Sequence, residues 1–329
     1  MAVCIVTEAE LRQCVGLDAE VLGTIEDCFT WLSEGRVTMP PIMHIDIPEH
    51  NGVMDIKSAY VKGEPSFAIK VGSGFFDNHL RGLPSSSAMM VLVSAETGLV
   101  EALLLDNGYL TDLRTGAAGA VAARHLAPAA VDTAGVFGAG AQARYQVAAL
   151  KMVREFRRIL VRGRSPERLE RYIAEMSAEL GVEVREAEGP EELVRESQVV
   201  VTTTPAEAPI VEAAWLHPGL HLTAMGSDTP AKQELEADVL ARADLVVCDR
   251  ASQCFDWGEL RAAKAAGALS ETSEVIELGE LTSGARGGRT AEDQITVCDL
   301  TGTGVQDTAI ALLAYRRARQ RGFGTEIAV

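Results

Sequence analysis

The second half of the chain, from about residue 133 to 299, alternates short apolar runs with helix-like segments. The runs are TAGVFG, RRILVRG, VEVREA, SQVVVTTT, LHLTAMG, ADLVVCD and QITVCD. They are apolar almost without interruption, which is typical of strands covered on both faces. Buried strands that alternate with helices predict an α/β fold with a doubly wound parallel sheet.

The first third of the chain has a different texture. Residues 8–34 carry apolar side chains at helical spacing and predict a surface helix packed on a core. Residues 42–106 form short strand-like runs separated by Gly, Pro and Asn, which predict an antiparallel sheet. An Ala-rich run at 109–127 predicts a closely packed helix with Thr111 as its N-cap. A last helix is predicted at 305–320.

The stretch GVFGAGAQARYQVAAL contains the G-x-G-x-x-A form of the dinucleotide-binding fingerprint, from Gly138 to Ala143. A strand-like run precedes it and a helix-like run follows it, as the fingerprint requires. Gly138 and Gly140 let the backbone approach a pyrophosphate, and Ala141 and Gln142 begin a helix whose free N–H groups attract that anion. The alternative is a tight turn in an Ala-rich region. The context favours a dinucleotide-binding site.

The end of the second strand of this domain reports on the type of cofactor. NAD enzymes usually place an acid there for the ribose 2′-hydroxyl. The chain reads VRGRSPERLE, with Arg164 and Ser165 and no acid before Glu167. A guanidinium and a hydroxyl suit a 2′-phosphate, so NADP is favoured over NAD. The alternative is that these are solvated loop residues.

Three threonines end the fourth strand-like run, at Thr202, Thr203 and Thr204. The carboxyl ends of the strands are where such sheets bind ligands, so these hydroxyls are candidates for contacts with the cofactor's ribose or pyrophosphate. Alternatively, threonine is simply a good strand former.

Cations in the first domain are candidate substrate ligands. Lys70 lies inside the apolar run FAIKV, where burial is costly unless the charge meets an anion. Arg114 begins a small-residue helix, where its guanidinium can grip a carboxylate bidentately. The alternative for both is an internal salt bridge, for which Asp106 and Asp112 are candidate partners.

Two further residues, Lys57 and His44, suggest a second anionic group on the substrate. Lys57 lies in DIKSAY and His44 on the preceding strand-like run MHIDI. If this segment lines the substrate pocket, the lysine would tend to lose its proton unless an anion faced it. The alternative is a surface ion pair of Lys57 with Asp55 or Glu64.

Asp228 follows an apolar run in TAMGSDTPAKQEL. A carboxylate there is either an Asx-turn residue before Pro230 or a group that moves a proton.

Composition excludes several classes of function. A formal charge of -17 argues against nucleic acid and anionic membranes as partners. No run reaches the ~18 apolar residues of a membrane span, and no secretory signal opens the chain. The six cysteines never form a C-x-x-C pair and the six histidines lack ligand spacing, which predicts no metal site. We therefore expect a cytoplasmic protein.

Several motifs, in this order, make the chain resemble the ornithine cyclodeaminase/mu-crystallin family over nearly its whole length. They are FAIKVGSGFFDN, LRTGAAGAVAA, GVFGAGAQARYQ, the strand ending MGSD, VIELGEL and TGTGVQDTA. The resemblance implies a dimer in which residues 1–117 and 305–329 form the substrate-binding and dimerisation domain and 118–304 a Rossmann domain. It implies that Lys70 and Arg114 bind the substrate carboxylate, with Lys70 also catalytic. Asp228 would be the catalytic acid, and Met225, Gly226 and Thr301 would lie near the nicotinamide.

Two departures bear on the reaction. The P-x-R segment and the MPA tripeptide of many members are replaced by PPIMHIDI and DIKSAY, and KSLG by DLTG at 299–302. These features resemble a branch associated with ectoine utilisation, often labelled cyclodeaminase, and the iminosuccinate reductases. The resemblance implies an NAD(P)H-dependent imine reductase or amino-acid dehydrogenase acting on a small, possibly dicarboxylic, imino or amino acid. The alternatives are a diamino-acid cyclodeaminase and a non-catalytic, crystallin-like NADPH-binding protein.

Overall fold

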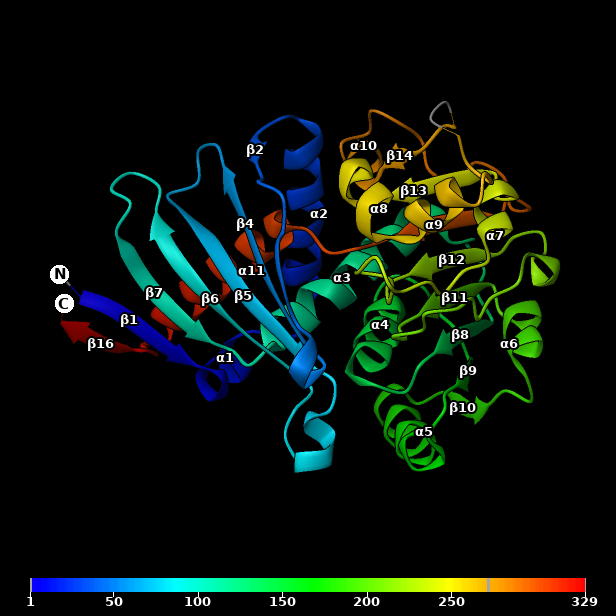
Figure 1. Cartoon of the computed structure of the whole chain (residues 1–329), viewed down its shortest axis with the longest axis horizontal. Coiled ribbons are helices and arrows are strands. Elements are labelled where there is room, and N and C mark those ends of the chain that lie inside the picture. The colour runs from blue at the N-terminus through cyan, green and yellow to red at the C-terminus, as the bar shows by residue number, and fades with distance from the viewer. Residues whose placement is uncertain (1, 271–272, 329) are drawn as a thin grey trace. The chain divides into compact units, whose positions relative to one another are not determined.

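A computed structural model describes residues 2–270 and 273–328 (Figure 1). The chain divides into two compact units. Unit 1 comprises residues up to Arg114 together with those from Thr303 onward, and unit 2 comprises Thr115–Gly302. The sequence-based boundaries, 117/118 and 304/305, lie within three residues of these divisions. Among the described residues, no helix combines the length and apolar character needed to cross a membrane.

Unit 1 is built on a mainly antiparallel sheet with the strand order β16-β1-β7-β6-β5-β4-β2, and β3 also pairs with β4. The strands are β1 (Ala2–Thr7), β2 (Val37–Thr38), β3 (Met43–Ile47), β4 (Gly52–Val61), β5 (Ser66–Phe75), β6 (Ser86–Ser94), β7 (Val100–Leu105) and β16 (Thr325–Ala328). The predicted runs at 42–106 are therefore strands. The sequence patterns did not indicate β1, β2 or β16. Strand β1 is parallel to β7, and β16 is antiparallel to β1 at one edge of the sheet.

Helices of unit 1 cover one face of this sheet. They are α1 (Glu8–Cys14), α2 (Ala19–Ser33) and α11 (Gly304–Gln320), and short 3-10 turns η1 (Pro48–His50) and η2 (Asn78–Arg81) lie in the connections. Helix α11 packs against β4 and β5 and beside α2. Gly304 permits this approach, because a Cβ there would lie 2.5 Å from the carbonyl oxygen of Ser58 in β4.

The other face of the unit 1 sheet is apolar and partly exposed. Cross-strand register places on this face Ile327, Val3, Ile5, Leu103, Leu105, Val91, Met89, Ile69, Val71, Ile56, Met54, Met43 and Ile45. Met43 is 58% exposed and Ile45 44%. We call this surface the open sheet face.

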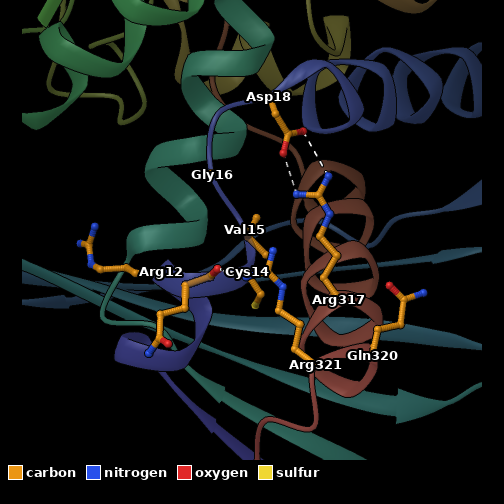
Figure 2. Close-up of a pocket in the computed structure, with 9 residues that line it drawn as sticks. Arg12, Cys14, Val15, Gly16, Asp18, Arg317, Gln320 and Arg321 are labelled. Carbon is orange, nitrogen blue, oxygen red and sulfur yellow. Dashed lines mark hydrogen bonds and ion pairs between the residues drawn. The ribbon is translucent and has the colours of Figure 1, made fainter.

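The predicted helix at 8–34 is interrupted, because the chain turns at 15–18 and Asp18 caps α2 by accepting a hydrogen bond from the Val21 N–H. Figure 2 shows the hollow of about 540 Å³ where α1, α2 and α11 converge. Arg317 holds Asp18 through two bonds of 2.7 and 3.2 Å, and Arg321 donates to the carbonyl of Gln13. The arginines of this hollow thus tie helix ends together.

Unit 2 is a parallel sheet with the order β10-β9-β8-β11-β12-β15-β13-β14. Its strands are β8 (Thr133–Phe137), β9 (Arg158–Arg162), β10 (Glu183–Glu186), β11 (Val199–Thr202), β12 (His221–Ala224), β13 (Leu245–Cys248), β14 (Ile276–Glu277) and β15 (Thr296–Asp299). Each predicted run of this half is a strand, and only the two-residue β14 was not anticipated. The parallel doubly wound sheet is confirmed.

Helices of unit 2 flank the sheet. They are α3 (Tyr109–Leu126, whose first residues belong to unit 1), α4 (Ala141–Lys151), α5 (Pro166–Leu180), α6 (Pro190–Glu196), α7 (Ala237–Ala241), α8 (Ala251–Trp257), α9 (Glu259–Ala265) and α10 (Leu278–Thr282), with a 3-10 turn η3 (Ala213–Trp215). Side chains of β11 alternate between two apolar clusters, with Val199 and Val201 in one and Val200 in the other. Both faces of this strand are therefore buried, which explains its unbroken apolar sequence.

Helix α3 begins two residues before the predicted cap. Asp106, not Thr111, caps it by accepting from the Leu110 N–H at 2.9 Å, and the Thr111 hydroxyl is buried. The small-residue face is as close-packed as predicted, because a Cβ on Gly116 would lie 2.9 Å from the Tyr145 carbonyl oxygen.

Candidate active site

The Gly-rich loop joins β8 to the N-terminus of α4. Gly138 has a φ of +114°, which L side chains rarely adopt, and a Cβ there would lie 2.4 Å from the Thr203 hydroxyl oxygen. Gly140 precedes the first residue of α4 and has open space beside its Cα. Glycine is therefore needed at the two positions for different reasons. At 138 the backbone conformation and the close contact require it, whereas at 140 it leaves room for a ligand.

A hollow of about 1160 Å³ opens beside this loop in unit 2. Its lining includes the predicted cofactor residues Gly138, Gly140, Arg164, Ser165, Thr203 and Thr204. The volume exceeds the range of common ligand pockets, and free N–H groups at the start of a helix face an anion favourably. The residues present therefore fit a nicotinamide dinucleotide, with its pyrophosphate at the Gly-rich loop.

Three arginines line the same hollow near the end of β9, namely Arg162, Arg164 and Arg168. Arg162 pairs with Glu186 at 3.2 Å. Arg164 is exposed and has no ion pair among the described residues. Arg168, which the sequence reading overlooked, follows Ser165 by one turn. The Ser165 hydroxyl oxygen caps α5 by accepting from the Arg168 N–H.

The three threonines at the end of β11, Thr202 to Thr204, do not present free hydroxyl protons. The Thr202 and Thr204 hydroxyls donate to the two oxygens of Glu234 at 2.5 and 2.7 Å. The Thr203 hydroxyl donates to the Phe137 carbonyl at 2.9 Å. Thr202 is fully buried and does not line the hollow, whereas Thr203 and Thr204 do.

The acceptor, Glu234, is a fully buried carboxylate that sequence reasoning missed. It also accepts from the backbone N–H groups of Thr204 and Gly226, at 2.6 and 2.8 Å. Burial raises its pKa, and these donors lower it in part. Glu234 thus joins the carboxyl ends of β11 and β12. Only its place in the polar segment AKQEL was visible in the sequence.

Asp228 lies in the loop after β12, with a side chain that is 45% exposed. Its Oδ1 lies 2.6 Å from the Nζ of Lys232. The Ser227 hydroxyl donates to the Lys232 carbonyl at 3.0 Å, which closes the turn that carries Asp228. Met225 precedes this turn, and its N–H continues the β11–β12 ladder by donating to the Thr202 carbonyl at 3.0 Å.

The remaining predicted cofactor residues lie at the start of α4 and in the loop after β15. Ala141 and Gln142 are the first two residues of α4. The Thr301 hydroxyl is buried after β15, donates to Asp249 at 3.1 Å and accepts from the side-chain amide of Gln253 at 2.7 Å.

Unit 1 contains a buried cluster of charges on the sheet face beneath α11. Lys57 and Lys70 are directly opposite each other on β4 and β5, and they are 8% and 4% exposed. Like charges in such a pair are unfavourable unless an anion lies between or beside them. The anion is Asp307 of α11, whose two oxygens lie 3.1 and 3.0 Å from the Lys70 Nζ.

Arg114 joins the same carboxylate through its Nε, 3.0 Å from Asp307 Oδ1. The internal salt bridge that the sequence left open for Lys70 and Arg114 is thus present, but with Asp307 and not with Asp106 or Asp112. Among the described residues, the terminal nitrogens of Arg114 have no hydrogen-bond partner. The part of the guanidinium that binds a carboxylate bidentately therefore remains available.

The charges of this cluster shift one another's protonation. Burial lowers the pKa of Lys70 to about 8, with Arg114 and Lys57 acting in the same direction and Asp307 against it. The pKa of Asp307 stays below its usual value, because these cations outweigh its burial. Burial raises the pKa of Asp106 to about 6. The sequence motif TGTGVQDTA contained Asp307, but nothing in it showed which cations the carboxylate meets.

His44 lies between two carboxylates. Its Nδ1 is 2.7 Å from Asp55 and its Nε2 3.0 Å from Asp46. The hydrogen bonds to these acids raise the pKa of His44 against the effect of burial. Asp55, one of the partners considered for Lys57, is therefore held by His44. Among the described residues, no group of three or more His, Cys, Asp or Glu side chains can hold a metal ion.

Known proteins resemble this chain over its whole length. Residues 2–322 match the ornithine cyclodeaminase/mu-crystallin family. A putative dehydrogenase of Rhizobium meliloti is 50% identical over 98% of this chain and 97% of its own. An uncharacterized cyclodeaminase of Sinorhizobium fredii is 48% identical over the same two shares.

Solved structures agree with the sequence matches. The Δ1-pyrroline-2-carboxylate reductase of Thermococcus litoralis, in complex with NADH and L-proline, has a TM-score of 0.94 at 29% identity and covers 98% of this chain and 100% of its own. An archaeal alanine dehydrogenase dimer with bound NAD has a TM-score of 0.92 at 31% identity, and the match covers 100% of this chain and 99% of its own. The iminosuccinate reductase of Paracoccus denitrificans with NAD⁺ has a TM-score of 0.91 at 29% identity, and the match covers 100% of both chains. The chain therefore belongs to the ornithine cyclodeaminase/mu-crystallin family.

Proposed function

We propose that the protein is a nicotinamide-dependent imine reductase or amino-acid dehydrogenase acting on a small imino or amino acid. The observation that carries the proposal is the buried cation cluster, in which Asp307 orients Arg114 through Nε and leaves its terminal nitrogens for a carboxylate. The family's oxidoreductases, with NAD or NADH bound in the solved structures, and the dinucleotide-sized hollow of unit 2 support it.

In this proposal the bound cofactor supplies or accepts a hydride at nicotinamide C4, and the substrate Cα is the other partner. Arg114 and Lys70 fix the α-carboxylate, which removes much of the entropic cost of reaching the reactive geometry. Asp228 gives a proton to, or takes one from, the substrate nitrogen. Lys232 holds the Asp228 carboxylate at 2.6 Å and orients it within its turn.

Three buried basic side chains, Lys57, Lys70 and Arg114, support a dicarboxylic substrate such as iminosuccinate. Lys57 and Lys70 are directly opposite each other on β4 and β5. In this proposal the α-carboxylate binds Arg114 and Lys70, and a second carboxylate would place a further anion beside the paired lysines.

The variant Lys57→Met tests this substrate class. We expect its KM for a dicarboxylic imine to rise by about tenfold or more, with a much smaller change for an alanine-derived imine, because one charge-assisted contact is lost only with the former. Lys62→Met, which removes an exposed lysine from the turn after β4, is the matched control. Equal effects of Lys57→Met on both substrates would remove the dicarboxylate assignment and leave the reductase proposal standing.

The second candidate is a cyclodeaminase, which the similarity to the Sinorhizobium fredii protein favours. Such an enzyme oxidises a diamino acid, closes a ring with loss of ammonia and re-reduces the product with the same cofactor. Net NAD(P)H consumption with an imino acid supports a reductase, whereas ammonia release without net cofactor turnover supports a cyclodeaminase. Tight cofactor binding without turnover across a panel of amino and imino acids would support a crystallin-like binding protein.

We also propose a preference for NADP, carried by Arg164 and extended by Arg168. Both line the hollow, and Arg164 has no competing ion pair among the described residues. Arg164→Ala should weaken NADPH binding several-fold more than NADH binding, because only NADPH carries a 2′-phosphate. Equal losses for both cofactors in a fluorescence titration would contradict the preference.

A further inference from the structure

Arg144, on the first turn of α4, reaches back over the Gly-rich loop. Its Nη1 donates to the carbonyl oxygens of Ala139 and Gly140, at 2.8 and 3.0 Å. These are the carbonyls of two successive peptide units of the loop. One guanidinium nitrogen thus fixes the direction in which both units point.

The guanidinium is itself anchored from α5. Its Nε and Nη2 donate to Glu175, at 2.8 and 2.5 Å, and it lies over the Tyr172 ring at 5.2 Å from the centroid. The buried Tyr172 donates its hydroxyl to the Ala143 carbonyl at 3.3 Å, which ties the same ring to α4. A planar fork held at both ends has little freedom, unlike a lysine ammonium.

Because the peptide bonds are trans, fixing the two carbonyl groups also fixes the direction of the N–H groups in the same peptide units. The C=O of each peptide points opposite to the N–H that follows it. Holding the Ala139 and Gly140 carbonyls toward Arg144 therefore turns the N–H groups of Gly140 and Ala141 the other way. Among the described residues, neither N–H has an acceptor.

We infer that Arg144 is a positioning residue that presets the N–H groups of Gly140 and Ala141 as the pyrophosphate-binding donors of unit 2. The hollow beside the loop is lined by Ala139 and Gly140, whose carbonyls Arg144 holds, whereas neither Ala141 nor Arg144 lines it. Arg144 therefore acts through the main chain of the loop, with the Gly140 N–H at the hollow and the Ala141 N–H as the next donor along the chain. The inference rests on the proposed nicotinamide-dependent function. It adds the residue that aims the loop, and it accounts for an arginine that no step of the reaction uses.

The test measures binding, so it does not depend on knowing the substrate. Dissociation constants for NADH, ADP-ribose and adenosine are determined for the wild-type chain and for Arg144→Gln and Arg144→Lys. We expect both variants to bind NADH and ADP-ribose about tenfold more weakly, and adenosine, which has no phosphate, within twofold of the wild type. Arg171→Gln, an exposed arginine of α5, controls for the loss of a positive charge and should change none of the three constants.

The two Arg144 variants separate a positioning role from simple attraction. If Arg144 merely attracts the pyrophosphate, Arg144→Lys keeps the charge and binds ADP-ribose like the wild type, which overturns the inference. An equal loss for adenosine and ADP-ribose in both variants also overturns it, because the whole hollow is then disturbed. Failure of the wild-type chain to bind any dinucleotide would instead overturn the proposed function, and this inference with it.

Discussion

At the scale of single residues, the carboxylates decide what the cations and loops of this protein can do. Glu234 and Asp307 are both fully buried, and each gathers donors from separate elements. Glu234 consumes the hydroxyl protons of two threonines that the sequence assigned to the cofactor. Asp307 consumes the Nε of Arg114 but leaves its terminal nitrogens. The buried carboxylates bind some of the hydrogen-bond donors, and only the remaining donors are available to a ligand.

Asp228→Asn should leave NAD(P)H affinity nearly unchanged and lower turnover by roughly a hundredfold, the usual scale for a general acid or base. The amide matches the carboxylate in size, and the Asp228 side chain is 45% exposed, so the fold should persist. Stopped-flow turnover and cofactor titration check the two halves of this prediction. Turnover close to that of the wild type would make Asp228 a turn residue only.

Asp307→Asn should move the alkaline limb of the kcat/KM profile to lower pH. Asp307 opposes the burial that lowers the pKa of Lys70 to about 8, so its neutralisation lowers that pKa further. In the proposed site, Lys70 would hold the substrate carboxylate only while protonated, and this binding would be lost as pH rises through its pKa. Asp293→Asn, which removes an exposed acid from unit 2, controls for net charge. An alkaline limb that stays in place would show that Asp307 does not set the charge of Lys70.

At the scale of elements, the connection between β8 and α4 contains one glycine that the fold requires, Gly138, and one that leaves space for a ligand, Gly140. Gly138→Ala should destabilise the protein by about 1 kcal/mol or more, because a left-handed φ disfavours a Cβ and the Thr203 hydroxyl oxygen lies 2.4 Å away. Gly140→Val should leave the melting temperature nearly unchanged but abolish NADH binding, because its side chain would fill the space proposed for the pyrophosphate. Thermal melts and NADH titrations of both variants are the measurement. A Gly140→Val protein that binds NADH normally would refute the pyrophosphate position.

At the scale of the whole molecule, the open sheet face of unit 1 supports the proposal of a homodimer. Large apolar side chains of this face on β16, β7, β6 and β3 are exposed, namely Ile327, Leu105, Met89, Met43 and Ile45, and exposed apolar patches often mark protein interfaces. The archaeal alanine dehydrogenase of this family is itself a dimer.

Met89→Asp places a charge on this face, and we expect it to convert the proposed dimer to a monomer in sedimentation experiments because an unpaired carboxylate would be buried in the interface. Leu83→Asp serves as the control. Leu83 lies in the connection between β5 and β6 and is 54% exposed, whereas Met89 is 37% exposed. Dissociation by both variants, or by neither, would contradict the assignment of the interface to this face.

The sequence by itself determined the local features of this protein. Strand runs, the Gly-rich fingerprint and the parallel sheet follow from periodicity and from turn chemistry, which act over a few residues. It also marked Lys70, because a charge within an apolar run must meet a counter-charge, and Arg114, because a guanidinium at the start of a small-residue helix can grip a carboxylate. It did not mark β1 and β16, which pair across more than 300 residues and have no pattern strong enough to identify either alone.

Only the tertiary structure decided which charges meet. Lys70 and Asp307 are 237 positions apart, and α11 brings them to 3.1 Å only because Gly304 admits the helix against β4. The carbonyls held by Arg144 and the threonine hydroxyls held by Glu234 are likewise fixed by contacts between elements. Sequence patterns report on a chain's local conformation and on the burial of its side chains. Which buried polar groups form hydrogen bonds or ion pairs with one another depends on the distances between them, and packing of the helices and strands sets these distances.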